Sequence, residues 1–154
     1  MHRAGPDDPL TKRLAFLGKA IREAFSDLLA AHGCTMPTWT VLSEAHHTPG
    51  LSQVQLAAQI GIEGPTLARH LDKLSHEGLV ERRRDPADRR IVRVALTPKG
   101  EQRWEELKHV RTDFDQRLTA GLDAEQTASL GIAIDRIHRA LEDAHDLIDL
   151  DHLG

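Results

Sequence analysis

Six arginines fall within residues 82–93, and guanidinium groups at this density could bind a polyanion. Each guanidinium offers several N–H donors in one plane, which suits phosphate oxygens. With two aspartates the segment carries a net charge of +4, whereas the whole chain carries −4. An acidic protein with one concentrated basic segment has a directional field, which favours a polyanion such as DNA. A solvated hairpin with exposed charge is the alternative interpretation. The arginines are Arg82, Arg83, Arg84, Arg89, Arg90 and Arg93.

The elements that must position these arginines are two short strands. Leu79 and Val80 precede the basic segment, and apolar residues alternate through 91–96 after it. Asp85, Pro86 and Asp88 between them are turn-forming residues. The pattern predicts a hairpin with a basic tip.

A helix-turn-helix is predicted immediately before this hairpin. Ser52 and Gln55 form a capping box at the start of a short helix, which Gly61 ends. Pro65 opens a second helix that runs to about Glu77. The inward residues of this second helix are Leu67, Leu71 and Leu74, and its polar outer face carries Thr66, Arg69, His70 and Lys73. An ordinary helical hairpin is the alternative, but a winged helix needs these parts in this order.

The two ends of the chain carry long amphipathic patterns. Apolar residues recur at heptad spacing from Leu10 to Leu28 and from Leu130 to Ile148, and residues 123–151 carry a net charge of −6. A narrow apolar stripe with charged flanks favours a partner helix, either within the same subunit or in a second copy. A further helix begins near Pro98, with an expected buried stripe from Trp104 to Leu118.

The predicted fold is mainly α-helical with a small β-wing. The expected organisation is a flexible tail at 1–8, a helical dimerisation region at 9–35 and 98–150, and a winged helix-turn-helix at 36–97.

Several function classes find no support in the sequence. There is no phosphate loop, nucleophile elbow or HExxH motif, so we expect no enzyme, no catalytic residue and no cofactor. The single Cys34 excludes an internal disulfide framework, and with no signal peptide or apolar run it indicates a cytoplasmic protein without membrane contact. Cys34, His46, His47 and His109 lack tight ligand spacing, so no metal site is predicted.

Two motifs resemble the MarR family of bacterial transcription regulators. Asp88 to Thr97 is similar to the family's Asp-x-Arg-x5-Leu-Thr signature. Residues 52–57 and 60–69, together with Trp39, are similar to the SlyA branch, although Gly64 stands where that branch often has a larger polar residue. The resemblance covers residues 10 to about 150 in the order and length of the elements.

The resemblance implies a homodimer that binds an inverted repeat in double-stranded DNA, a palindromic operator, and acts as a repressor. It also implies that Arg90 enters the minor groove and that Asp88 braces it; a simple turn-capping role for Asp88 is the alternative. From the residues themselves, Thr66, Arg69 and His70 are candidates for base or phosphate contacts. Lys73, Arg82, Arg84 and Arg89 are candidates for phosphate contacts.

Family members often bind small aromatic acids or phenols, which here implies a ligand site with Trp39 as a wall and Arg22 or Arg69 as carboxylate partner. A core position for Trp39 is the alternative. Two alternatives to ligand control stay open: a ligand-independent DNA-binding protein that counters nucleoid proteins, and a redox- or metal-responsive regulator that uses Cys34. An interaction module built on the acidic last helix is a further rival. The operator, the effector, the regulated genes and the direction of regulation are not specified by the sequence.

Overall fold

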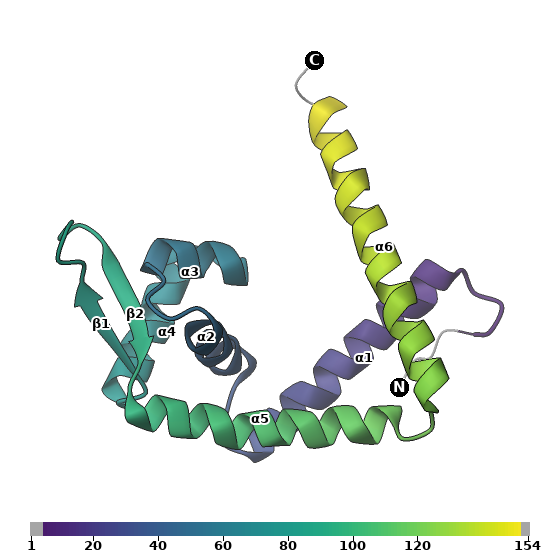
Figure 1. Cartoon of the computed structure of the whole chain (residues 1–154), viewed down its shortest axis with the longest axis horizontal. Coiled ribbons are helices and arrows are strands. Elements are labelled where there is room, and N and C mark those ends of the chain that lie inside the picture. Colours follow the sequence, from purple (N-terminus) through teal and green to yellow (C-terminus); the bar gives the residue numbers. More distant parts are fainter. Residues whose placement is uncertain (1–4, 152–154) are drawn as a thin grey trace. The chain divides into compact units, whose positions relative to one another are not determined.

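The computed structural model describes residues 5–151, with side chains described for residues 5–144. This part of the chain contains helices α1 (Leu10–Ala31), α2 (Met36–His47), α3 (Gln53–Ile60), α4 (Gly64–His76), α5 (Pro98–Thr119) and α6 (Ala124–Asp151), with strands β1 (Val80–Arg84) and β2 (Val92–Leu96) before α5 (Figure 1). The described residues divide into two compact units, with the boundary between Asp113 and Phe114. The predicted helical fold with a small wing is confirmed.

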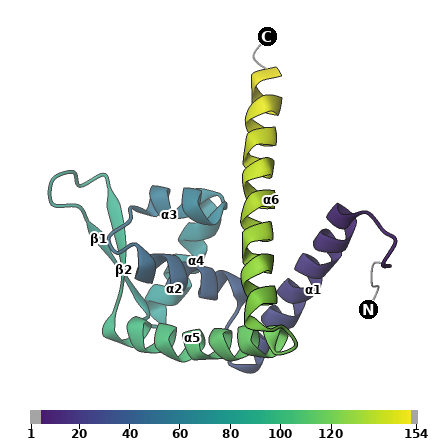
Figure 2. The same ribbon diagram turned by 45° about the vertical axis from the view of Figure 1, so that its right-hand side comes forward.

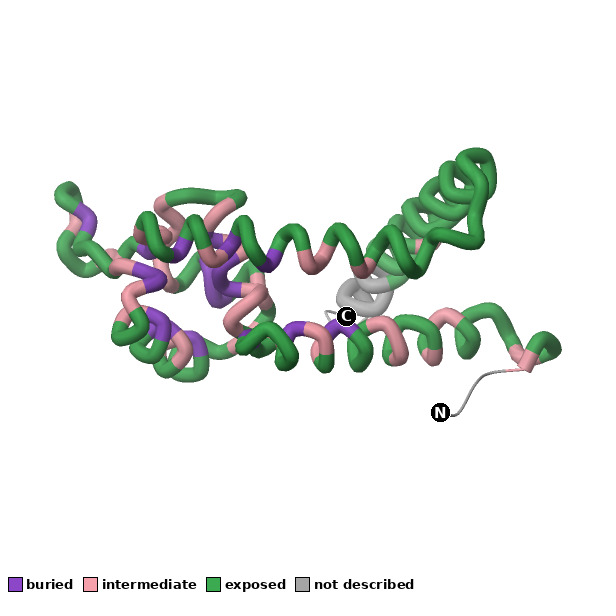
Figure 3. The backbone as a smooth tube through the Cα atoms, turned by 90° about the horizontal axis from the view of Figure 1, so that it is seen from below, coloured by how far each residue is buried: buried purple, intermediate pink, exposed green. Residues whose placement is uncertain are grey.

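Aliphatic side chains form the core of the first unit. They come from α1 to α5 and the hairpin, and Figure 3 shows the buried positions gathered there. The largest fully buried side chains are Leu29, Val41, Leu42, Leu56, Leu67, Leu71, Leu74, Val94 and Leu107. Burial of each such side chain contributes roughly 1.5–3 kcal/mol. This core fixes α3, α4 and the hairpin as one body.

Capping residues and a glycine fix the ends of α3 in the helix-turn-helix, as the sequence predicts. The Gln55 amide donates to Ser52 Oγ over 3.1 Å, and the Ser52 amide donates to Gln55 Oε1 over 2.9 Å. This capping box satisfies amides that the first turn of α3 leaves free. Gly61 ends α3 with a φ of 68°, a left-handed conformation that favours glycine. The turn then leads into α4, with Pro65 in its first turn.

The hairpin is a two-stranded antiparallel sheet. Val80 pairs with Leu96 and Arg84 pairs with Val92. The Val94 amide donates to Leu51 O over 2.9 Å, and Ser52 forms an isolated bridge with Arg93. The segment before α3 thus lies along β2. Figure 2 shows the hairpin extending beyond the helices that support its base.

The second unit contains the end of α5 and all of α6, which begins with another capping box. The Gln126 amide donates to Asp123 Oδ1 over 2.8 Å, and the Asp123 amide donates to Gln126 Oε1 over 3.0 Å. The predicted apolar stripe of α6 is uncovered: Leu130 is 46% exposed, Ile134 is 51% exposed and Leu141 is 60% exposed. The stripe's last member, Ile148, lies outside the described side chains.

The expected buried stripe of α5 is wrong at its end, whereas the expected flexible tail at 1–8 stays a prediction. The stripe of α5 is buried at Trp104 and Leu107, but Leu118 is 51% exposed, since the core ends before it. Of the expected tail, residues 1–4 lie outside the described part, and 5–8 include a turn in which the Asp8 amide donates to Gly5 O over 3.2 Å. None of the helices that the structure describes has the length and apolar character needed to cross a membrane.

Gly100 provides a test of the packing between the hairpin and α5. A Cβ atom at this position would lie 2.0 Å from the carbonyl oxygen of Leu79, which is backbone and cannot rotate away. We predict that Gly100→Ala lowers the free energy of unfolding by about 1–3 kcal/mol or more. Urea denaturation followed by circular dichroism measures this.

Gly64→Ala is the matched control, because a Cβ there meets nothing within 4 Å. Equal stability of the Gly100→Ala variant and the wild type would contradict the close approach.

Candidate nucleic-acid interface

The outer face of α4 presents the polar side chains that the sequence singles out. Thr66, Arg69 and Lys73 are exposed and His70 is half-buried, whereas Leu67, Leu71 and Leu74 on the other side are buried. Helical spacing places the four polar residues on one side of the helix. Lys73 also lies 3.8 Å from Glu77 in an ion pair. One exposed polar surface therefore runs along α4.

The arginines of the hairpin divide between the two faces of the sheet. Side chains alternate along a strand, so Arg82 and Arg84 share a face with the buried Val80, and Arg83 points to the other face. Arg93 lies opposite Arg83 in the register and therefore shares that second face. The six arginines are thus not one equivalent cluster.

Arg90 and Asp88 form a bidentate pair at the hairpin tip. The Arg90 Nε and Nη2 atoms each donate to an Asp88 carboxylate oxygen over 3.0 Å. The Arg90 side chain is 91% exposed, whereas that of Asp88 is 34% exposed. The hydrogen bonds from Arg90 lower the pKa of Asp88, and the same pair raises the pKa of Arg90. The geometry orients an exposed guanidinium, and its role as a DNA contact stays a prediction.

Asp85 is the buried charged residue at the base of the tip, 7% exposed. Its carboxylate accepts a hydrogen bond from Arg93 Nε and others from the amides of Ala87, over 2.8 Å, and Asp88, over 3.2 Å. Arg93 Nη1 donates in turn to Gly50 O over 2.7 Å. The hydrogen bond from Arg93, followed by those from the two amides, lowers the pKa of Asp85. Asp85 is therefore ionised at neutral pH.

The other predicted phosphate contacts have different surroundings. Arg82 Nη2 lies 2.5 Å from Asp72 Oδ1, so this side chain joins β1 to α4. Arg84 Nη1 donates to Arg89 O over 3.4 Å. Arg89 is exposed. The structure thus uses Arg82 in an intramolecular ion pair that a phosphate would have to compete with.

A cavity of about 360 Å³ lies between the start of α3, the start of α4 and the hairpin. Its lining combines apolar and polar residues from all three elements: Ser52, Gln53, Val54, Gly64, Arg90, Ile91 and Val92. Val54 is 80% exposed despite its apolar side chain. Arg90 and Gly64, which is at the amino end of α4, therefore line the same cavity.

The predicted ligand-site residues do not share one cluster of contacts. Trp39 is half-buried and packs on Phe25, with centroids 5.3 Å apart, and on Trp104, with centroids 4.8 Å apart. These contacts favour the core interpretation of Trp39. Arg22 on α1 and Arg69 on α4 are both exposed. A ligand site made of these three residues stays a prediction.

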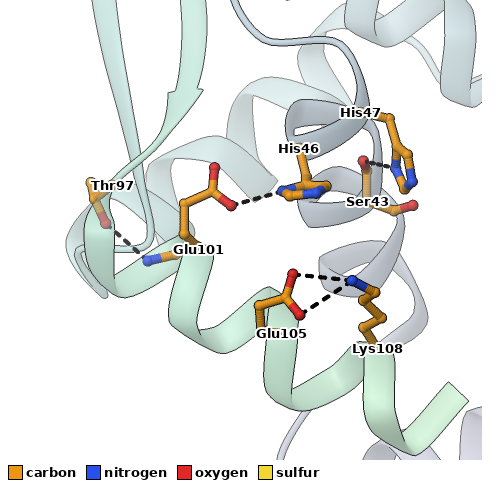
Figure 4. A network of polar contacts seen from close by, with 8 residues as sticks. Ser43, His46, His47, Thr97, Glu101, Glu105 and Lys108 are labelled. Atoms are coloured by element: carbon orange, nitrogen blue, oxygen red, sulfur yellow. Dashed lines mark hydrogen bonds and ion pairs between the residues drawn. The ribbon is translucent and has the colours of Figure 1, made fainter. Parts of the chain in front are cut away.

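Two of the histidines considered as metal ligands have partners within the protein (Figure 4). His46 Nδ1 donates to Glu101 Oε2 over 2.7 Å, and His47 Nδ1 donates to Ser43 O over 2.7 Å. No group of three potential ligands converges among the residues that the structure describes. Burial raises the pKa of the Cys34 thiol, which disfavours the reactive thiolate.

Sequence reasoning missed the internal roles of Asp72, Asp85 and Arg93. The sequence predicts Asp85 only as a turn residue and Arg93 only as one of six basic residues. The strand alternation that separates Arg93 from Arg82 and Arg84 is a usable signal once the register is known. The pairing of Asp72 with Arg82 is tertiary and has no sequence signal.

Comparison with known proteins agrees with this geometry. Residues 34–92 match the model of the MarR family. Apo MarR from E. coli is 25% identical with a TM-score of 0.77, covering 86% of this chain and 98% of that one. A mutant E. coli MarR complexed with operator DNA is 26% identical with a TM-score of 0.72, covering 84% and 93%. The PcaV transcriptional regulator from Streptomyces coelicolor is 26% identical with a TM-score of 0.66, covering 84% and 97%.

The helix-turn-helix followed by an arginine-rich hairpin defines a winged-helix fold. The chain therefore has the winged-helix fold of the MarR family, and residues 34–92 match the model of that family. We therefore call the hairpin the wing and α4 the recognition helix.

The lowered pKa of Asp85 gives a pH-dependent prediction. A carboxyl whose pKa is lower in the folded state contributes stability that is present above its unfolded pKa of about 4 and is lost as the pH falls through the folded pKa. We predict that Asp85→Asn lowers the free energy of unfolding at pH 7 and that the difference from wild type shrinks on acidification below about pH 4.

Urea denaturation of both proteins at neutral and acidic pH measures the difference. Glu81→Gln is the control, because Glu81 is a half-buried carboxylate on β1 whose partner is the exposed Arg83. A difference that stays constant across this pH range would show that the Asp85 charge does not stabilise the fold.

Proposed function

We propose that this chain is a sequence-specific DNA-binding regulator of the SlyA-like branch that acts as a homodimer on an inverted repeat and represses transcription. The recognition helix enters the major groove, and the wing places Arg90 in the adjacent minor groove. The proposal rests on one observation above all: an exposed guanidinium held by a bidentate carboxylate at the tip of the wing.

The chemistry of this tip suits a narrow minor groove. A planar cation fits the enhanced negative potential of an A·T-rich groove, and a fixed direction lowers the entropy lost on binding. Arg69 on the recognition helix can donate two hydrogen bonds to a guanine. Such a pair favours guanine over the other bases by about 1–3 kcal/mol. A related MarR has been determined in complex with operator DNA, which supports DNA as the partner.

The uncovered apolar residues of the terminal helices support a second copy as the other partner. On α6, Leu130, Ile134 and Leu141 lie at heptad spacing and are all about half exposed or more. On α1, Leu10 is 59% exposed and Leu17 is 56% exposed. Exposed apolar stripes of this kind are typical of helices that pack on a partner. A two-fold dimer would match half-sites about one turn, roughly 34 Å, apart.

Release by a small aromatic acid or phenol belongs to the proposal only as an implication of the family resemblance. The packing of Trp39 on Phe25 and Trp104 favours a structural role for this residue. Ligand-independent binding that counters nucleoid proteins is the alternative, and the length of the protected DNA footprint separates the two modes. No enzymatic activity is proposed.

The DNA-binding proposal predicts a large effect of Arg90→Ala. Loss of one positioned guanidinium contact costs about 1–3 kcal/mol, which is about 5- to 150-fold in affinity. Fluorescence anisotropy with a duplex from the region upstream of the chain's own gene measures the dissociation constant.

Arg117→Ala is the matched control, because it removes the same charge from an exposed position on α5 outside the wing. Equal affinities of the wild type and the Arg90→Ala variant would refute the assignment of the wing.

The dimer predicts that a charge on the stripe of α6 separates the subunits. We expect Ile134→Asp to shift the protein from dimer to monomer at micromolar concentrations, because a carboxylate would be desolvated at the interface. Sedimentation equilibrium measures the mass.

Ile132→Asp is the control. Ile132 is 55% exposed but lies about 200° around the helix from Ile134, at 100° per residue, so this variant should stay dimeric. A wild type that sediments as a monomer at these concentrations would overturn the proposed dimer.

A further inference from the structure

Arg93 links the body of the first unit to the tip of the wing. Its Nη1 atom donates over 2.7 Å to the carbonyl of Gly50, which lies in the loop between α2 and α3. Its Nε atom donates to the Asp85 carboxylate, which is at the start of the wing turn. One guanidinium therefore ties together two segments that are far apart in the sequence.

The connection continues from Asp85 to Arg90. Asp85 Oδ1 accepts hydrogen bonds from the amides of Ala87 and Asp88, and so fixes the backbone that carries the Asp88 side chain. The Asp88 carboxylate then accepts a hydrogen bond from the backbone amide of Arg90, over 3.0 Å, and two more from the Arg90 guanidinium. An unbroken series of hydrogen bonds thus runs from Gly50 through Arg93, Asp85 and Asp88 to Arg90.

Burial distinguishes the inner part of this series from its outer end. Asp85 is 7% exposed, and the Arg93 side chain is 46% exposed with two donors used inside the chain. The Arg90 side chain is 91% exposed. The series therefore has an anchored end in the body and a free end that can meet DNA. A polar network holds a single geometry only when its members are satisfied, and here the buried member, Asp85, is satisfied by Arg93 and two amides.

We propose that Arg93 is a positioning residue for DNA recognition, which acts through Asp85 and Asp88 to hold Arg90 at the angle needed for the minor groove. The inference rests on the proposed DNA binding and deepens it. Arg93 differs in this from Arg82, Arg84 and Arg89, which are candidates for direct phosphate contacts. Its effect on affinity should exist only while Arg90 is present.

A double-mutant cycle on DNA affinity tests the coupling. The probe is a duplex selected from a random-sequence pool with the wild-type protein. We expect Arg93→Met to weaken binding by about tenfold or more in the wild-type background and by less than about twofold in the Arg90→Ala background. Equal losses in the two backgrounds would overturn the proposal, since they would show that Arg93 acts independently of Arg90.

Two further variants separate position from charge. Arg83→Met removes the same charge from the residue opposite Arg93 in the register and leaves the hydrogen-bond series intact, so it should cost much less affinity than Arg93→Met. Arg93→Lys keeps the charge but loses the planar pair of donors, and it should behave like Arg93→Met. Full affinity in the Arg93→Lys variant would overturn the positioning role.

A measurement without DNA keeps the inference distinct from the proposed function. In NMR spectra of the free protein, the Arg90 Nε–H should give a resonance shifted by its bond to Asp88. That resonance should move to the position of a free arginine in Arg93→Met and stay unchanged in Arg83→Met. An Arg90 resonance that stays at its wild-type position in the Arg93→Met variant would overturn the proposal, even if the wild type binds DNA. A wild type that selects no duplex would instead overturn the proposed function.

Discussion

The ion pair between Asp85 and Arg93 is the constraint on which the proposed interface depends. A carboxylate that is 7% exposed must be compensated, because a charge with little access to water is unfavourable without partners. Arg93 and two backbone amides supply that compensation. The same bonds fix the wing turn relative to the strand β2 and the loop at Gly50. The charge of the wing is thereby held in place by a buried charge of opposite sign.

This constraint explains how a two-stranded hairpin can hold a fixed position on the core. An isolated two-stranded sheet is only marginally stable in water. Here the base of the wing is held by Val80 and Val94 in the core, by the bridge between Ser52 and Arg93, and by the ion pair between Arg82 and Asp72. The recognition helix is fixed to the same core by three leucines. Helix and wing therefore keep one geometry toward a duplex.

Much of the fold was predictable because its signals are local. The Ser52–Gln55 capping box and the end of α3 at Gly61 are predicted from adjacent residues, and both are confirmed. The hairpin followed from its turn residues and alternation, and it is confirmed as well. The partners of individual arginines could not be predicted in this way. Asp72 and Arg82, or Gly50 and Arg93, meet only when the strand register and the packing of α4 are known. The DNA contacts of Thr66, Arg69, His70 and Arg90 stay predictions.

The salt dependence of DNA binding tests the central claim most directly. A protein that neutralises phosphates with positioned arginines and lysines releases condensed cations, so the logarithm of its affinity falls linearly with the logarithm of salt concentration. The account predicts a steep negative slope for the wild type on a selected inverted repeat, with a slope shallower by about one for each phosphate-binding residue removed. A slope near zero would contradict the account, because the wing and the recognition helix would then form no ion pairs with DNA phosphates.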